Sequence, residues 1–222
     1  VLVIVSGVAT FVMLRSTMNS LSLTQERFYQ DYGFADVFAS LKRAPENVKD
    51  RIASIPGVNQ VETRVVADVK LKIEGFNEPV TAKLVSVPDD GRPLLNRIYI
   101  KKGRMVDPWK DNEVVVSEGF ADAHHFSLGD KIGAVINGRW KRLDIVGTAL
   151  SPEFILQIKP GGISVDFKRY AILWMGRTTL GTAYDMKGAF NDVVLTLSPG
   201  ANTNDILVQL DNLLNWYGGL GS

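Results

Sequence analysis

The two histidines of the chain, His124 and His125, are adjacent. A metal site on a helix needs its two histidines four residues apart on one face, whereas neighbouring residues of a helix point about 100° apart. The two rings therefore cannot easily share an ion, and an exposed helix end is the expected setting. Asp122 and Asp130 lie near in sequence, but a Ser-His-Asp arrangement also needs a nucleophile, and none is marked. We predict no metal site and no catalytic residue.

Motifs of the common enzyme classes do not occur in the sequence. It contains no G-x-x-x-x-G-K-[ST] phosphate loop, no H-E-x-x-H zinc motif and no G-x-S-x-G nucleophile turn. The glycine-rich residues 218–221 follow a helical pattern instead of opening one, so they indicate a tail or a linker back to the membrane. We therefore expect no cofactor and no enzyme activity.

Composition narrows the class of protein further. The chain has 222 residues, of which 45% are hydrophobic and 22% charged, as in a globular protein of one large or two small domains. Its 25 basic and 24 acidic residues give a net charge of +1, which provides no global field for nucleic acid or for an anionic membrane. Because the sequence has no cysteine, disulfides, thiolate metal sites and cysteine nucleophiles are excluded.

Residues 1–14 form an uncharged apolar run that ends at Arg15. A membrane-spanning helix needs about 20 such residues, so the run is short by itself, but the sequence starts with Val1 rather than methionine. We expect the outer end of a transmembrane helix, cut by the start of a fragment. Two other interpretations stay open. One is a buried core helix, which usually keeps a polar stripe; the other is a signal-peptide core, although no basic residue precedes the run and no cleavage site follows it.

Beyond Arg15 the helical rhythm continues with no proline or glycine before Gly33. The pattern predicts that residues 1–32 are the end of the transmembrane helix followed by an amphipathic stalk. Arg15 and Arg27 are the two basic residues of this stretch, and so few basic groups weakly favour an external face. The candidate stalk residues are Met18, Leu21, Phe28 and Tyr32.

Residues 33–96 predict a β-α-β-β unit. A strand is expected over 35–41 and a helix from Pro45 to Ile55, where Pro56-Gly57 ends it. Apolar and charged residues then alternate over 69–74 and return over 80–84, which is the pattern of two half-buried strands.

Residues 97–150 predict a small, mostly β subdomain. Residues 114–116 form an apolar strand, and 118–125 can make one or two helical turns. Asn137-Gly138 is the strongest short hairpin signal, and it lies between strands expected over 134–136 and 143–146.

Residues 151–222 begin with a long loop and continue as β-α-β-α. The expected elements are a strand over 170–175, a helix over 178–186, a strand over 190–197 and a last helix capped by Thr203 or Asn204. The two α/β halves, β-α-β-β and β-α-β-α, are expected to pack into one layer with the β-rich subdomain inserted between them. The predicted fold class is therefore α+β.

The long loop carries apolar residues where loops are usually polar. Such residues commonly fold back on the core; otherwise they contact a partner, a membrane-proximal segment or an apolar substrate. The candidate partner or substrate contacts are Phe154, Ile155, Leu156 and Ile158.

The order of these pieces resembles the extracytoplasmic (periplasmic core) domain of MacB/FtsX-type ABC transporter permeases, over nearly the whole chain. The most specific stretch has strand, short helix, turn and hairpin strand in the family's order: Val114-Val115-Val116-Ser117, Leu128-Gly129-Asp130 and Leu143-Asp144-Ile145-Val146-Gly147. Three more stretches carry the resemblance: the apolar helix running into Phe28-Tyr29 and Asp36-Val37, the helix end Ile55-Pro56-Gly57-Val58, and Phe190-Asn191-Asp192-Val193. The resemblance implies a porter-like α/β unit with an inserted β-rich subdomain.

The resemblance also implies a function. The chain would be the external domain of a permease in the cytoplasmic (inner) membrane, on its periplasmic or extracellular side, with a separate cytoplasmic ATPase subunit as partner. ATP-driven motion of the transmembrane helices would be carried outward, to export or release a substrate or to act on a protein partner outside the membrane. A dimer in the full transporter stays open.

Two other classes of function compete with the permease. The alternative is a membrane-anchored extracytoplasmic module that binds a ligand or a protein without transport. A membrane-tethered hydrolase is the weaker competitor, because it lacks a marked nucleophile or metal set.

Overall fold

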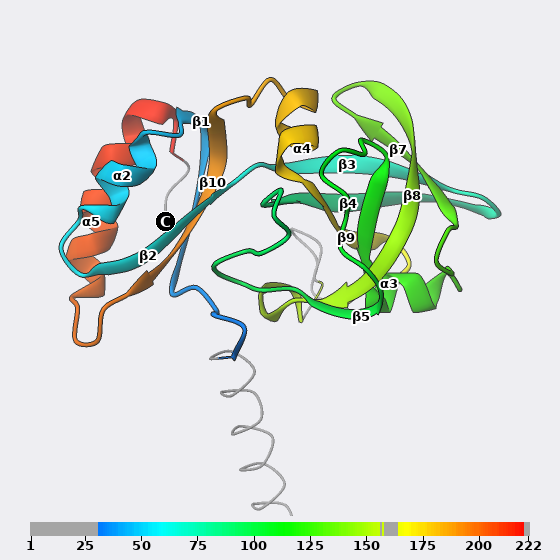
Figure 1. The fold of residues 1–222 in the computed structure, drawn as a ribbon, viewed down its shortest axis with the longest axis horizontal. Coiled ribbons are helices and arrows are strands. Elements are labelled where there is room, and N and C mark those ends of the chain that lie inside the picture. Colours follow the sequence, from blue (N-terminus) through cyan, green and yellow to red (C-terminus); the bar gives the residue numbers. More distant parts are fainter. Residues whose placement is uncertain (1–30, 156, 158–163, 220–222) are drawn as a thin grey trace, which may run out of the picture.

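The computed structural model describes residues 31–155, 157 and 164–219. They form two lobes that lie side by side (Figure 1). The α/β lobe comprises residues 35–64 and 189–219, and the closed-sheet lobe comprises the described residues between 65 and 188. The chain crosses from the first lobe to the second at Val65 and returns through residues 184–188. The closed-sheet lobe is therefore an insertion within the α/β lobe.

A three-stranded antiparallel sheet forms the α/β lobe, in the order β1 (Val37–Pro45), β10 (Ala189–Leu197) and β2 (Val58–Arg64). The helices α2 (Val48–Ala53) and α5 (Thr203–Leu214) cover one face of this sheet, and the 3-10 turn η2 (Asn215–Tyr217) follows α5 (Figure 1). Since side chains alternate across a strand, Val193 and Leu195 of β10 pack into the helix-side core, whereas Val194 belongs to a separate cluster. The opposite face of the sheet is thus left for the second lobe.

Helix α5 shows how local sequence fixes an element. Its apolar stripe, Ile206, Leu210 and Leu214, is buried against the sheet. The helix begins after Asn202, whose side chain accepts a hydrogen bond of 3.2 Å from the backbone N–H of Asn204. The cap is therefore one residue earlier than Thr203, the nearer of the two expected caps, because the Asn202 side chain reaches the first free N–H groups.

Seven strands form the sheet of the second lobe, in the order β5-β8-β6-β9-β4-β3-β7, and a further pairing of β8 with β7 closes it. The long strand β8 makes the closure, because its first half pairs with β7 and its second half with β6 and β5. The strands are β3 (Val66–Ile73), β4 (Phe76–Val87), β5 (Tyr99–Gly103), β6 (Glu113–Ser117), β7 (Lys131–Ile136), β8 (Arg139–Leu150) and β9 (Tyr170–Gly176).

The closed sheet encloses a core that two short helices complete. Phe120 of α3 (Glu118–Ala123) and Leu180 of α4 (Arg177–Ala183) both belong to this core. Figure 1 shows the two helices at opposite ends of the closed sheet. Outside the sheet, Trp174 of β9 lies in a second cluster, which the 3-10 turn η1 (Pro152–Phe154) helps to cover.

The mixed α/β architecture is confirmed, but the insertion is longer than residues 97–150. Strands β3 and β4, expected in the half spanning 33–96, and β9, expected in the half spanning 151–222, belong to the closed sheet. The predicted β-α-β-β and β-α-β-α halves are therefore wrong, and the α/β lobe consists of β-α-β followed by β-α. The reason is that β9 has apolar residues on both faces, in two clusters, so its sequence does not say which sheet it joins.

Strands β2 and β5 have no counterpart among the predicted elements. Both are rich in polar and charged residues, and neither shows the alternation that predicts a half-buried strand. The predicted transmembrane segment and all of the stalk except Asp31 and Tyr32 lie outside the described residues. Within the described part of the chain, no helix is long and apolar enough to cross a membrane.

Candidate functional site: a polar joint between the lobes

Charged residues occupy the face of the three-stranded sheet that turns away from its helices. Glu62 and Arg64 of β2 and Asp192 of β10 are all buried there. Arg64 and Asp192 are partners in the strand pairing, so their side chains lie next to each other. Buried charges need charged or hydrogen-bonded partners, and the closed-sheet lobe supplies the remaining ones.

Arg64 is shared by two carboxylates, one from each lobe. Its Nε donates to Asp192 Oδ1 over 2.7 Å, and its Nη2 donates to Glu153 Oε1 over 3.0 Å, while Nη1 donates to the other Glu153 oxygen. Glu153 lies on η1 of the closed-sheet lobe. Burial alone would lower the pKa of Arg64, but the charges of Asp192 and Glu153 outweigh it and raise that pKa. The guanidinium therefore stays charged and ties the lobes together.

The polar residues through which the two lobes contact each other, beginning with Arg64, Asp192 and Glu153, are called the joint. Asn96 extends the joint to the start of the α/β lobe. Its Nδ2 donates to Glu153 Oε2 over 2.9 Å, and its Oδ1 accepts from the backbone N–H of Ala35 over 3.0 Å. The next residue back, Leu95, donates its N–H to Glu62 Oε2 over 2.7 Å. Burial raises the pKa of the Glu62 carboxyl. Leu95 and Asn96 of the closed-sheet lobe thus reach the charged face at two places: Leu95 contacts Glu62 directly, and Asn96 contacts Glu153, the partner of Arg64.

Asn96 and Arg97 also bind the segment that leads into β1, residues 31–35. These hydrogen bonds are called the clasp. The backbone N–H groups of Asn96 and Arg97 donate to the carbonyls of Gly33 and Tyr32, each over 2.8 Å. Arg97 Nη2 also donates to the carbonyl of Asp31 over 2.8 Å. A displacement of residues 31–35 must therefore either move the closed-sheet lobe with them or break these hydrogen bonds.

A second contact lies on the other side of the joint, at α4. Arg177 Nη1 donates to the carbonyl of Thr63 over 2.9 Å, and Nη2 donates to Glu46 Oε2 over 3.0 Å and to the carbonyl of Ala189 over 2.9 Å. Burial lowers the pKa of Arg177, and the charge of Glu46 opposes that effect. Arg177 therefore pins both chain crossings, because Thr63 precedes the first and Ala189 follows the second.

Asn191 of β10 links the two lobes at the first chain crossing, next to Val65. Its Oδ1 accepts from the N–H of Val66 over 2.8 Å, and its Nδ2 donates to the carbonyl of Val66 over 2.7 Å. Beside this crossing lies a cavity of about 190 Å³. Residues of both lobes line it: Glu46, Lys49, Glu62, Thr63, Ser86, Pro88 and Arg177.

The joint is a network of hydrogen bonds and ion pairs among side chains of the two lobes. Its donors and acceptors satisfy each other across the two lobes, and the joint holds no serine or histidine paired as nucleophile and base. Among the residues that the structure describes, no group of three or more potential metal ligands gathers. What the arrangement can do is hold the lobes in one orientation until its polar contacts are exchanged for water.

The candidate contact residues of the long loop differ in their surroundings. Phe154 folds back on the core, with its ring centroid 6.3 Å from that of Trp174, whereas Ile155 is 46% exposed. Leu156 and Ile158 lie outside the described residues, as do the stalk candidates Met18, Leu21 and Phe28. The remaining stalk candidate, Tyr32, places its ring edge-on to Tyr99, at 5.9 Å between centroids.

His124 takes part in packing. Its ring lies against Phe76 and Phe120, at 5.0 and 4.7 Å between centroids, and its Nε2 lies 2.8 Å from the carbonyl of Lys168. The joint residues themselves were missed by sequence reasoning, which assigned no strand to residues 58–64. One available signal was the motif Phe190-Asn191-Asp192-Val193, because two of its residues, Asn191 and Asp192, lie in the joint.

An open hollow lies on the outside of the closed sheet, over β3, β7 and β8. Its volume is about 660 Å³, and Lys72 and Arg142 flank Gly133 at its floor, since both pair with that residue. The Trp140 ring lies so close to Gly133 that a Cβ atom there would come within 2.1 Å of it. The complete lining is Lys72, Glu74, Phe126, Asp130, Lys131, Gly133, Trp140 and Arg142.

Three solved structures are similar to this chain, and the first of them has a TM-score above 0.5. The extracellular domain of the ABC-type transporter YknZ from Gram-positive bacteria is 14% identical and has a TM-score of 0.51, over 82% of this chain and 90% of that one. The periplasmic region of MacB from Actinobacillus actinomycetemcomitans is 12% identical, with a TM-score of 0.48 over 85% of this chain and 89% of that one. A permease domain from Porphyromonas gingivalis is 14% identical, with a TM-score of 0.44 over 81% and 84%.

The family assignment rests on sequence. No curated protein matches the chain. The model of the family described as MacB-like periplasmic core domain matches residues 1–213. Since this match spans far more than half of the sequence, the chain belongs to the family of MacB-like periplasmic core domains, the extracytoplasmic domains of ABC transporter permeases.

Proposed function

We propose that this domain transmits ATP-driven motion of transmembrane helices to the space outside the membrane. Residues 1–32 would bring that motion from the membrane, and a separate cytoplasmic ATPase subunit would supply it. The two lobes would then change orientation, and this change would export or release a substrate or act on a protein partner.

The observation that carries the proposal is the clasp on residues 31–35. Four backbone groups of this segment, from Asp31 to Ala35, are hydrogen-bonded to Asn96 and Arg97 of the other lobe. Asn96 is bonded in turn to Glu153, the partner of Arg64. A pull on the segment thus acts on both lobes at their point of contact, which is what a mechanical coupling requires.

The composition of the joint suits a change of orientation. Its apolar part is small: Ala35, Leu95 and Val194 are buried together, with Phe38 packed against them. The hydrogen bonds and ion pairs described above make up its polar part, and polar groups can exchange protein partners for water at a modest net cost. Relative motion is the default for lobes joined in this way, whereas a large apolar interface would prevent it.

Ile155, together with Leu156 and Ile158, is the proposed contact to a partner or an apolar substrate. Ile155 is exposed next to Phe154, which seals the core, and Glu153 of the joint is two residues away. A partner bound at this loop would therefore lie next to Glu153, so a change at the joint would alter the position of its binding residues. The full transporter would bring two such domains together if it is a dimer.

A distance measurement in the complete transporter tests the proposal. In a complete transporter whose cysteines outside this sequence are replaced, Lys42→Cys and Trp109→Cys place one spin label on each lobe at exposed positions. We expect the distance distribution between the labels to shift when the ATPase is trapped with nucleotide. The control pair, Lys42→Cys with Val208→Cys, lies within the α/β lobe and should not shift. A lobe-to-lobe distance that ignores the nucleotide state would contradict the proposal.

The hollow beside Trp140 favours a second candidate function, a membrane-anchored module that binds a ligand or protein without transport. An exposed indole beside lysine and arginine side chains offers stacking and ion pairing in one place. Under this alternative, Trp140→Ala would abolish ligand capture, and the distances above would stay the same in every nucleotide state.

A further inference from the structure

The hollow on the outside of the closed sheet brings three cations and one indole onto a single face. Strand β3 pairs with β7, and β7 pairs with β8, so residues opposite one another in these pairs point to the same side of the sheet. In one row, Lys72 and Arg142 both lie opposite Gly133. In the next row, Lys70 and Trp140 both lie opposite the same residue of β7. The Trp140 side chain is therefore surrounded by positive charge.

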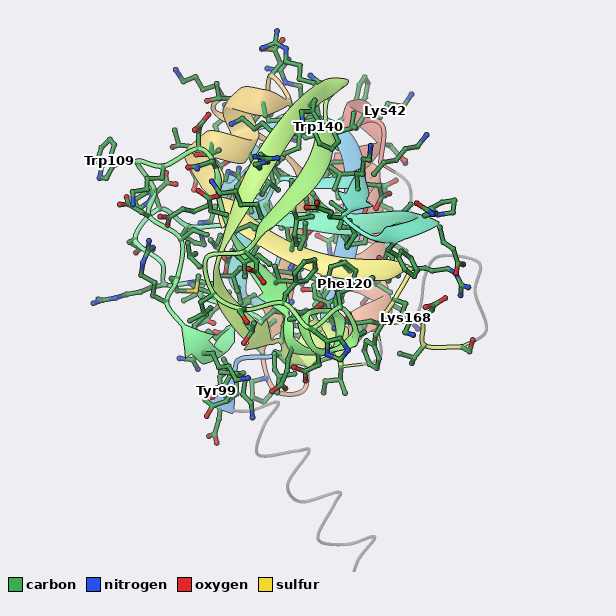
Figure 2. The ribbon with its side chains drawn as sticks, turned by 90° about the vertical axis from the view of Figure 1, so that its right-hand side faces the viewer. Lys42, Tyr99, Trp109, Phe120, Trp140 and Lys168 are labelled. Atoms are coloured by element: carbon green, nitrogen blue, oxygen red, sulfur yellow. The ribbon has the colours of Figure 1, made fainter. Side chains whose placement is uncertain are left out.

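The ring of Trp140 lies on the floor of this hollow. A Cβ atom added to Gly133 would come within 2.1 Å of Cη2 and 2.5 Å of Cζ2 of the indole, so the ring rests on the outer side of the glycine backbone. Trp140 is nevertheless 57% exposed. Figure 2 shows Trp140 over the green strands β7 and β8, at the end of the lobe away from Tyr99. The indole thus offers an open aromatic surface that the backbone supports.

The cations around the indole are not neutralised by the protein. In the part of the chain that the structure describes, no acidic group forms an ion pair with Lys70, Lys72 or Arg142. The remaining cation of the hollow, Lys131, differs from them, because it pairs with Asp144 over 3.2 Å. An anion that entered the hollow would therefore find partners that are still available.

The carboxylates that line the hollow lie at its other end. Asp130 comes directly before β7 and Glu74 directly after β3. Because these two strands pair antiparallel, both residues lie at one end of the pair, whereas Trp140 lies opposite Val135 near the other end. Asp130 also accepts a hydrogen bond of 2.7 Å from the backbone N–H of Ser127. Negative charge is thus favoured at the indole end of the hollow.

We infer that the hollow binds a small anion whose charged group is attached to a flat ring, such as an aromatic carboxylate. The ring would stack on Trp140, and the charged group would lie between Lys72 and Arg142. The hollow has a volume of about 660 Å³, and sites for small molecules span roughly 300–1,000 Å³. The inference gives a ligand class to this hollow and does not rest on the mechanical function, because no residue of the joint lines it.

Fluorine NMR of the full chain in neutral detergent tests the site. The four tryptophans are replaced by 5-fluorotryptophan, and Trp140→Phe and Trp109→Phe assign the two resonances that matter. The probe is 2-naphthoate. We expect a saturable shift of the Trp140 resonance and none of the Trp109 resonance, because Trp109 is 90% exposed on the same lobe but away from the hollow (Figure 2). A shift of both resonances alike, or of neither, would overturn the inference.

Two further probes separate the ring from the charge. The compound 2-naphthalenemethanol has the ring without the charge, and hexanoate has the charge without a ring. At equal free concentration, each should bind about tenfold more weakly than 2-naphthoate, because each loses one of the two kinds of contact. If the neutral compound binds as tightly as the acid, the site does not select anions and the inference is wrong.

Variants of the hollow test the role of its cations. Lys72→Gln with Arg142→Gln should weaken the binding of 2-naphthoate about tenfold and leave that of 2-naphthalenemethanol unchanged. The matched control is Lys42→Gln with Arg43→Gln, which removes the same residue types from exposed positions of β1 in the other lobe. An equal effect of the two double variants on 2-naphthoate would contradict ion pairing in the hollow.

Gly133→Ala tests the placement of the ring. The added Cβ displaces the indole while every cation stays, so both naphthalene compounds should bind more weakly. Circular dichroism establishes that this variant is folded. Unchanged binding to the folded variant would show that the ring does not need its support on Gly133, and the stacking part of the inference would fail.

The result can be distinguished from that of the proposed function. If Trp140 does not respond to 2-naphthoate while the distance between labels on Lys42→Cys and Trp109→Cys changes with nucleotide, the ligand site is wrong and the mechanical function stands. If Trp140 responds and that distance stays constant, the ligand site stands and the mechanical function fails.

Discussion

Arg64 and Glu153 form a two-point ion pair although 89 positions separate them and each belongs to a different lobe. The pair is nearly inaccessible to water, and Asp192 holds the remaining side of the guanidinium. One cation therefore neutralises two buried carboxylates. The stability of the joint depends on this cation more than on either carboxylate.

Replacing Arg64 with methionine should destabilise the protein strongly. The change leaves Glu153 and Asp192 buried without a counter-charge, which costs about 3–5 kcal/mol of unfolding free energy. Urea denaturation followed by circular dichroism measures the loss. Arg169→Met is the control, because Arg169 pairs with Glu78 on the surface, where both side chains are about half exposed. A similar loss in both variants would contradict the role of burial.

A triple variant distinguishes lost charge pairing from lost packing. When Glu153→Gln and Asp192→Asn are added to Arg64→Met, no buried charge is left uncompensated at these positions, so part of the lost stability should return. If the triple variant is as unstable as Arg64→Met alone, the loss comes from packing.

Glu113 should make stability depend on acid pH. Its hydrogen bonds from Arg104 lower its pKa from 4.5 to about 2. Since the pKa is depressed in the folded state, the stabilising contribution is present above pH 4.5 and is lost as the pH falls from 4.5 towards about 2. Glu113→Gln should remove this part of the pH dependence, measured as unfolding free energy against pH. An unchanged acid slope in the variant would refute the assignment.

Glu62 should make the unfolding free energy depend on pH in the opposite direction. Burial raises its pKa above 4.5, and the hydrogen bond from the Leu95 N–H and the charge of Arg64 only partly oppose that effect. The contribution of a group with a raised pKa is present below pH 4.5 and is lost as the pH rises through its folded-state pKa. Glu62→Gln keeps an acceptor for the Leu95 N–H but cannot ionise, so it should be more stable than the parent at neutral pH and equal to it in acid. A variant that is less stable at every pH would show that the charge itself is needed.

Hydrophobic periodicity predicted most elements of the fold but not their assignment to sheets. The hairpin at Asn137-Gly138 formed as expected, with both residues at positive φ, because a two-residue turn is encoded locally. Strand β9 pairs with β4 and β6, which are distant in sequence, so no local pattern specifies those partners. Long-range pairing is where reading a single sequence fails.

The joint could not be predicted for a related reason. Glu62 and Arg64 have the residue types of a solvated surface, and their burial becomes understandable only when Glu153, Asn96 and Asp192 arrive from elsewhere in the chain. The exposed stretch around Ile155 was visible in sequence because apolar residues in a loop are unusual. A buried charge network leaves no comparable local signal.

Gly103 should tolerate no side chain. Its φ is +79°, and an added Cβ would lie 2.2 Å from the carbonyl oxygen of Val146 and 2.9 Å from the Cα of Gly147, its partner on β8. Gly75 has nearly the same φ, +76°, but nothing within 4 Å of the added atom. Gly75→Ala should therefore cost about 1 kcal/mol from backbone strain alone, and Gly103→Ala distinctly more. Thermal or urea unfolding of the two variants compares them, and equal losses would show that crowding at the β5–β8 pair is relieved without cost.

Asn96→Gly should open the clasp without unfolding the lobes. Asn96 has a φ of +47°, which glycine adopts freely, so the change removes the side chain without adding strain. The Ala35 N–H then loses its acceptor and Glu153 loses a donor. Hydrogen exchange should therefore accelerate at Ala35, while exchange in the core of α5 stays slow. Asn202→Gly is the control, because it removes the cap of α5, where exchange should accelerate instead of at Ala35. If Ala35 remains protected in the Asn96 variant, the two lobes are held at this point by their backbone contacts alone, and motion of residues 31–35 does not need the Asn96 side chain to reach Arg64.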